Sequence, residues 1–283
     1  MAVQVWEVIG DGDRAVLNER LSEKWPSMTT DDITRELPIG AYTTFRTYNH
    51  HFAINVESHF DRLEETARLA NKPISLQRAI IRAGIRAAIE ITSNSDSRIR
   101  ILVDLSVRPG RVFLLLEPLR TPAAECYEKG VDVVTSRIVR DNPQAKLTNF
   151  IFIAHEARQS LNSRYEEILR VDEMGRILEG LTSNFFVVVY DQLRTAEHGV
   201  LLGVTRSIVL KEALQMGIEI RFEPVSIHEI AEVTEAFITS SSRGVLPVRS
   251  IDRKRIGSGM PGPYTQLLIK QFEKKILKLL RPI

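Results

Sequence analysis

Apolar residues that recur three or four positions apart predict a set of amphipathic helices. In the stretch 56–70, Phe60, Leu63 and Ala67 would form one helical face. A second helix is expected over 75–92, with Ser75 as its cap. Further helices are predicted after Lys146, over 205–216, and over 263–280, where Leu267, Leu268, Phe272, Ile276 and Leu279 form one stripe.

Alternating and apolar runs between these helices predict strands. A short strand is expected over 3–8, and residues 41–55 read as a hairpin with Asn49 and His50 near its turn. Residues 98–107 and 111–119 read as two strands joined by the turn Arg108-Pro109-Gly110. Further strands are predicted near 131–138, 165–171, 183–190, 218–223, 234–239 and 245–251.

The order of these elements predicts an α+β fold with two domains. Residues 119–130 contain proline and show no clear period, which is typical of a linker. We therefore expect a small N-terminal α/β domain over 1–118 and a larger C-terminal mixed α/β domain over 131–283.

Composition narrows the class of protein. The chain has 283 residues, 43% of them hydrophobic, and a net charge of +2, so neither nucleic acid nor a membrane surface is an expected partner. The single Cys126 excludes an internal disulfide and favours a reducing compartment. Acidic residues near the start argue against a signal peptide, and no apolar run is long enough to span a bilayer. We expect a soluble cytoplasmic protein.

Several kinds of site have no support in the sequence. The glycine-rich nucleotide-binding loops G-x-G-x-x-G and G-x-x-x-x-G-K-[ST] are absent. No G-x-S-x-G motif surrounds any serine. The six histidines lack metal-binding spacing, and the adjacent His50 and His51 would point to opposite faces of a strand, so no metal is expected.

Two segments have the chemistry of an anion site. Gly203, Val204 and Thr205 lie at the entrance of a predicted helix, where unpaired backbone N–H groups face outward. A strand ending in "TSSSRG" (239–244) places serine hydroxyls and amides together. An ordinary helix cap and a serine-rich turn are the alternative interpretations.

Three charged residues complete the candidate chemistry. Arg62 lies one helical turn from His59 and is suited to a two-pronged grip on phosphate. Glu179 precedes the segment "GLTSNFF" and is either an exposed turn residue or a buried carboxylate. Lys146, in "KLTNF", is either a solvated lysine or an amine held in a pocket.

The motifs occur in one order along most of the chain: "TTFRTY", "HFDRL", "KLTNF", "LEGLTSN", "LLGVTR" and "TSSSRGVLPV". In this order they resemble the class IV aminotransferases, the fold-type IV pyridoxal-phosphate enzymes. That family includes branched-chain aminotransferases, D-amino-acid aminotransferases and aminodeoxychorismate lyases. The resemblance extends from about Gly40 to Pro261. It implies pyridoxal 5'-phosphate as cofactor, amino acids and 2-oxo acids as substrates, and a homodimer.

The resemblance also assigns roles to residues. Lys146 matches the lysine that forms a Schiff base with the cofactor and then acts as the base. Glu179 matches the glutamate that pairs with the pyridine nitrogen. The matches to the phosphate cradle are Arg62, Val204, Thr205 and Ser241, and Ser183 and Asn184 match positions beside the cofactor.

The candidate substrate-binding residues lie on the predicted strand over 40–48 and in the serine-rich turn. Period two places Tyr42, Thr44 and Arg46 on one face of the strand. Tyr42 matches a position that often contacts substrate in the family. Arg46 and Arg243 are candidates for gripping a substrate carboxylate, with a structural ion pair as the alternative for each, and Ser242 adjoins Arg243.

Two departures from the branched-chain pattern keep the substrate open. Phe150 stands where those enzymes usually have tyrosine, and the polar turn 240–243 replaces Gly-Thr-Ala-Ala. "TTFR" is similar to a stretch in the lyases. The predicted function is transamination through a Lys146 Schiff base, with branched-chain amino acids among the candidate donors. The alternatives are an aminodeoxychorismate lyase that releases pyruvate and 4-aminobenzoate, and a non-catalytic binding protein.

Overall fold

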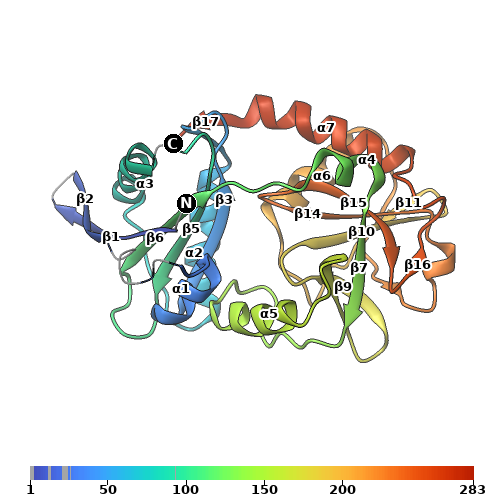
Figure 1. Ribbon diagram of the computed structural model, residues 1–283, viewed down its shortest axis with the longest axis horizontal. Coiled ribbons are helices and arrows are strands. Elements are labelled where there is room, and N and C mark those ends of the chain that lie inside the picture. The colour runs from blue at the N-terminus through green and yellow to red at the C-terminus, as the bar shows by residue number, and fades with distance from the viewer. Residues whose placement is uncertain (1–2, 12–13, 21–24, 26, 93) are drawn as a thin grey trace. The chain divides into compact units, whose positions relative to one another are not determined.

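The chain divides into two compact units in the computed structural model, which describes residues 3–11, 14–20, 25, 27–92 and 94–283 (Figure 1). Unit 1 combines residues 1–120, 145–155 and 279–283, and unit 2 combines 121–144 and 156–278. The domain boundaries expected from the sequence stay a prediction. No helix among the described residues has the length and apolar character that crossing a membrane requires.

Unit 1 is built on an antiparallel sheet with the strand order β2-β1-β6-β5-β3. Its strands are β1 (Gln4–Asp11), β2 (Arg14–Arg20), β3 (Gly40–Arg46), β5 (Ser97–Asp104) and β6 (Val112–Pro118). A separate ladder joins β4 (Phe52–Ile54) to β17 (Leu280–Pro282). In the sheet, β3 is an edge strand: it pairs with β5 on one side, and on the other side Ala41 forms a single bridge with Leu147.

Both faces of this sheet are covered by apolar side chains. On one face, Ala41 and Phe45 of β3 pack with α2 (Val56–Leu69) and α3 (Arg78–Thr92). On the other, Tyr42 packs in a second cluster with residues of α1 (Thr30–Glu36). The alternation predicted for this strand is confirmed, and it places Tyr42 on the face opposite Phe45.

The predicted hairpin over 41–55 is wrong in its pairing, although the turn lies where it was expected. Tyr48 N donates to Phe52 O at 2.8 Å and Phe52 N donates to Tyr48 O at 3.1 Å, which closes the turn. Beyond that bridge, β3 pairs with β5 and β4 pairs with β17. His50 and His51 lie in this turn rather than on opposite faces of a strand, and their ring centroids are 4.1 Å apart.

Unit 2 contains a mixed sheet that closes on itself. The strands β10, β14, β15, β7, β8 and β9 pair in that order, and β9 pairs again with β10. The bounds of these strands are β7 (Val131–Ser136), β8 (Tyr165–Val171), β9 (Arg176–Gly180), β10 (Asn184–Val189), β14 (Glu235–Ser240) and β15 (Gly244–Ile251). Short strands extend it: β11 (Gln192–Arg194), β12 (Ile220–Arg221), β13 (Val225–Ser226) and β16 (Lys254–Arg255).

The remaining helices follow the predicted pattern with three differences. They are α4 (Ala124–Lys129), α5 (Asn149–Gln159), α6 (Val204–Gln215), the 3₁₀ turn η2 (Ile230–Glu232) and α7 (Pro263–Leu279). The helix α4 occupies part of the expected linker. The helix α3 begins at Arg78, so Ser75 does not cap it. Leu267 is 39% exposed, so the buried stripe of α7 is Leu268, Phe272 and Ile276. The α+β class is confirmed.

Candidate active-site residues

Lys146 lies on a backbone segment that is fixed to the free side of β3. Lys146 O accepts a hydrogen bond from Tyr42 N at 2.9 Å, and Thr148 N donates to Gly40 O at 2.9 Å. The Lys146 N–H donates to the Thr66 hydroxyl of α2 at 3.1 Å. Both peptide groups of Lys146 are therefore bonded, which restricts where its side chain can reach.

The side chain of Lys146 lies among aromatic and cationic groups of unit 1. Its Nζ is 4.8 Å from the ring centroid of Tyr42. His59 is 1% exposed, and its Nδ1 is 2.7 Å from the Thr43 hydroxyl. The positive charges of Lys146 and Arg62 both act on this ring. Burial, and then these two positive charges, hold the pKa of His59 well below its ordinary 6.5. His59 is therefore neutral at pH 7, and Arg62 and Lys146 supply the positive charge here.

The other substrate candidates on β3 differ in their contacts. The Thr44 hydroxyl oxygen is buried and has no hydrogen-bond partner within the described part of the chain. Arg46 is 3.2 Å from Asp96 in an ion pair, and its guanidinium lies 4.3 Å from the centroid of the Tyr48 ring. Thr44 thus retains a hydroxyl for a ligand, whereas the contacts of Arg46 match the ion-pair alternative. The substrate role of Arg46 stays a prediction.

Glu179 is a buried carboxylate in β9, with 2% of its side chain exposed. Its Oε1 accepts from Arg140 at 3.1 Å and from Arg170 at 2.9 Å. Its Oε2 accepts from the Asn184 amide at 3.3 Å and from Leu201 N at 2.9 Å. Two guanidinium groups and two neutral donors therefore stabilise the charged form of this carboxylate.

The arginines around Glu179 were missed in the sequence. Burial is the main cause that lowers the pKa of Arg170, and the positive charge of Arg140 adds to it, while Glu179 opposes both. Arg206 is a third buried arginine in this region, and Glu179 acts on its charge as well. A signal for Arg170 existed, because an arginine between Leu169 and Val171 in a predicted strand needs a partner if it is buried. Nothing local in the sequence pointed to Arg140.

The first turn of α6 lies beside the Glu179 cluster and has no side-chain cap. Gly203 is its N-cap and supplies no side-chain cap, so the amides of Val204 and Thr205 are donors. A Cβ at Gly203 would lie 2.1 Å from Asn184 Oδ1, so any other residue here would displace the Asn184 side chain. Asn184 also donates to Leu201 O at 2.6 Å. Asn184 thus connects the predicted glutamate to the predicted phosphate-binding turn.

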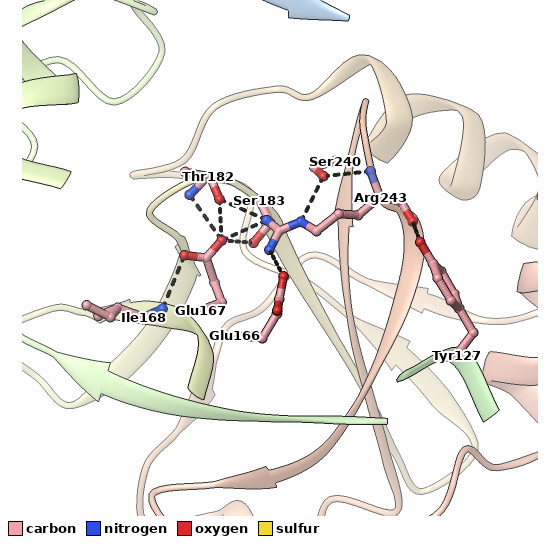
Figure 2. Close-up of polar contacts among 8 residues, drawn as sticks. All are labelled: Tyr127, Glu166, Glu167, Ile168, Thr182, Ser183, Ser240 and Arg243. Carbon is pink, nitrogen blue, oxygen red and sulfur yellow. Dashed lines mark hydrogen bonds and ion pairs between the residues drawn. The ribbon is translucent and has the colours of Figure 1, made fainter. Parts of the chain in front are cut away.

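The serine-rich turn between β14 and β15 is held by a buried ion pair. Figure 2 shows the Arg243 guanidinium between Ser240, Thr182 and two glutamates. Arg243 is 2.8 Å from Glu167 and 3.2 Å from Glu166. These contacts match the alternative that Arg243 forms a structural ion pair rather than binding a substrate carboxylate. The substrate roles of Arg243 and Ser242, and the phosphate role of Ser241, stay predictions.

Glu167 joins this turn to the turn before β10. Its carboxylate accepts from the hydroxyls of Thr182 and Ser183 as well as from Arg243 (Figure 2). Burial opposes the charge of Glu167, but Arg243 and Thr182 outweigh it, so the pKa of Glu167 lies below its ordinary value. Ser183 therefore contacts Glu167, whereas its neighbour Asn184 contacts Glu179.

Comparisons with known proteins agree on one family. A profile of the family described as amino-transferase class IV matches residues 40–251. The protein named "Probable branched-chain-amino-acid aminotransferase" of Thermotoga maritima is 32% identical over 252 residues, 87% of this chain and 89% of that protein. The D-alanine aminotransferase of Bacillus licheniformis is 26% identical over 281 residues, which is 93% of this chain and 97% of that protein.

A solved structure shares the fold. The branched-chain amino acid aminotransferase from T.th., crystallised with pyridoxamine 5'-phosphate, superposes with a TM-score of 0.79 at 19% identity. The match covers 100% of this chain and 99% of that one. The fold-type IV architecture expected from the sequence is confirmed.

The buried pair of Arg243 and Glu167 yields a stability prediction. Arg243→Met leaves the Glu167 carboxylate, 1% exposed, without its counter-charge. We expect it to lower the free energy of unfolding by about 3 kcal/mol. Adding Glu167→Gln in the same chain removes the unpaired charge and restores part of that loss. Urea unfolding measures both.

The matched control for this pair is Arg221→Met. Arg221 pairs with Glu219 at 2.6 Å, but both side chains are about half exposed, at 51% and 53%. We expect a loss of less than about 1 kcal/mol there. A loss for Arg243→Met as small as that of the control would contradict the assigned role of the buried pair.

Proposed function

The chain belongs to the class IV aminotransferase family, whose cofactor is pyridoxal phosphate, and we propose that it transfers amino groups between branched-chain amino acids and 2-oxo acids. The proposal rests mainly on Lys146, whose backbone N–H and C=O are both hydrogen-bonded, so that the position of its amine is restricted. The branched-chain donor is supported by the names of several relatives, including those of Thermotoga maritima and Pseudomonas aeruginosa.

The side chains present fit pyridoxal phosphate as a chemical group. Lys146 offers the amine that reacts with its aldehyde. Glu179 offers a buried carboxylate for the ring nitrogen. The Val204 and Thr205 amides, the Ser241 hydroxyl and Arg62 offer donors and positive charge for the phosphate. We assign these residues, with Ser183 and Asn184 in support, to cofactor binding.

When bound, the cofactor supplies an aldehyde that reacts with amines and a ring that accepts electron density from the substrate Cα. Lys146 Nζ would hold the cofactor through its aldehyde and would act as the base for the proton on the substrate Cα. Its fixed backbone limits the atoms this nitrogen can reach. Glu179 would hold the ring nitrogen of the cofactor, and its carboxylate is kept in place by ion pairs with Arg140 and Arg170.

Arg140, Arg170, the Asn184 amide and Leu201 N all donate to the Glu179 carboxylate, which has roughly four lone-pair sites. A ring N–H would compete with the longest of these contacts, the 3.3 Å bond from Asn184. Asn184 can release it at little cost because its amide also donates to Leu201 O. We therefore assign Asn184 as the residue that yields to the cofactor.

Tyr42, Thr44 and Ser242 are proposed to contact the substrate. The buried, unpartnered hydroxyl of Thr44 supports this, since such a group is stabilised by a ligand that hydrogen-bonds to it. A homodimer in the cytoplasm remains the expected assembly and compartment.

A substrate panel tests the proposed reaction. The purified chain, loaded with pyridoxal phosphate, is mixed with single amino acids, and the visible absorbance is followed. We expect leucine, isoleucine or valine to convert the cofactor to its amine form, and 2-oxoglutarate to reverse the change. Conversion by D-alanine alone would replace the branched-chain proposal. Pyruvate released from aminodeoxychorismate without a 2-oxo acid would favour the lyase.

Removing the amine of Lys146 should abolish covalent attachment of the cofactor. We expect Lys146→Ala to lose the visible band of the lysine-bound cofactor and to lower turnover by roughly 10⁴-fold. Circular dichroism should show an unchanged fold. The control is Lys254→Ala, an exposed lysine of β16. Wild-type turnover in Lys146→Ala would refute the proposed role.

Neutralising Glu179 should slow the reaction while the cofactor stays bound. Glu179→Gln removes the charge that keeps the ring nitrogen protonated, so we expect turnover to fall by roughly 100-fold with the visible band retained. Stopped-flow absorbance measures the rate. Glu173→Gln, in an exposed turn, serves as the control. Equal rates for Glu179→Gln and wild type would exclude Glu179 from this role.

A further inference from the structure

The turn between β3 and β4 brings two histidines together. Asn49 and His50 both have left-handed backbone, with φ of 47° and 68°. Consecutive residues of this conformation are uncommon without glycine, and they reverse the direction of the chain. As a result, the rings of His50 and His51 meet edge to face at 77°, with their centroids 4.1 Å apart.

A carboxylate from another element completes the group. Glu90 lies near the end of α3, and its Oε1 is 3.5 Å from His51 Nδ1. One ligand atom from each of His50, His51 and Glu90 lies within 4.8 Å of the others. The side chains of His51 and Glu90 are 47% and 67% exposed, so they can move the remaining distance toward a shared ion.

The backbone fixes His50 in a form that can bind a metal. His50 Nδ1 is 2.5 Å from the carbonyl oxygen of Asn94. A carbonyl only accepts hydrogen bonds, so Nδ1 carries the proton and the neutral ring has its lone pair on Nε2. Histidines that bind metals commonly donate their other ring N–H to a carbonyl or carboxylate in this way. Asp96 also accepts from His50 N at 3.1 Å, which holds the residue in place.

We propose that His50, His51 and Glu90 form a binding site for a divalent ion of the zinc class. Two imidazoles and one carboxylate are ligands typical of zinc, cobalt, nickel and copper. Magnesium and calcium prefer oxygen ligands alone, so they are not expected here. Water completes the coordination because the chain supplies three ligands, and the site is independent of the residues assigned to the cofactor.

The ion would connect elements of unit 1 that are distant in sequence. Glu90 belongs to α3, while His51 O accepts from Ile283 N at 3.0 Å beside the β4–β17 ladder. An ion bound to both therefore ties α3 to this ladder. Because the ion binds the folded arrangement of ligands, it should raise the unfolding temperature of the protein.

Calorimetric titration with Zn²⁺ tests the site in the full chain loaded with pyridoxal phosphate. The protein should be free of affinity tags, treated with a chelator and desalted, because free cofactor also binds metals. We expect saturable binding of about one Zn²⁺ per chain at this site. His51→Ala and Glu90→Gln should each weaken it by about tenfold or more. Mg²⁺ at the same concentration should give no saturable heat.

A second histidine–glutamate pair in the chain provides the control. His198 lies 3.8 Å from Glu197 at the surface, and no third metal-ligating side chain joins this pair among the described residues. His198→Ala should leave Zn²⁺ affinity unchanged. Circular dichroism checks that each variant is folded, and if His51→Ala is unfolded, Glu90→Gln decides the test. Wild-type affinity in Glu90→Gln, or no saturable binding by the wild type, would overturn the proposal.

Discussion

The position of Lys146 is set by hydrogen bonds that join Lys146 and Thr148 to the edge of β3. A lysine side chain is long and flexible, so the position of its amine is set largely by its backbone. Here the Lys146 carbonyl is bonded to Tyr42 and its N–H is bonded to Thr66. One strand and one helix therefore determine where the amine can act. The buried His59, whose pKa is lowered, is neutral and adds no positive charge near the Lys146 amine.

Unit 2 supplies a different kind of constraint, in which a buried charge is balanced by several partners. Glu179 would be unstable in its site without Arg140 and Arg170. With Arg206 also buried nearby, the cationic groups outnumber this carboxylate. The positive charge lies close to the start of α6, because Asn184 donates both to Glu179 and to the carbonyl of Leu201 just before that helix. This combination favours a ligand that carries a phosphate.

The neighbouring residues Ser183 and Asn184 contact two different buried carboxylates. Asn184 contacts Glu179, and Ser183 contacts Glu167. Ser183 ends the turn and Asn184 begins β10, so this short segment contacts both carboxylates. Arg243 completes the Glu167 pair and thereby connects the turn before β10 to the turn after β14 (Figure 2).

The sequence predicted the elements whose signal is local. The helices α2 and α7 are long and strongly amphipathic, and β8 was predicted at its observed bounds. The pairing of β4 with β17 could not be predicted, because it joins residues more than two hundred positions apart and each strand is short. The same reason hid the partners of Glu179 and the bonds that fix Lys146, since these contacts arise only from tertiary structure. The turn at Asn49 and His50 was predicted, but the left-handed backbone that brings the rings of His50 and His51 together was not, because neither Asn49 nor His50 is glycine.

We propose that the amine of Lys146 is the one that bonds to the cofactor. The most direct test is to treat the cofactor-loaded protein with borohydride, digest it, and locate the added mass by mass spectrometry. We expect the phosphopyridoxyl group on the peptide that contains Lys146. The same group on another lysine, with Lys146 unmodified, would contradict it.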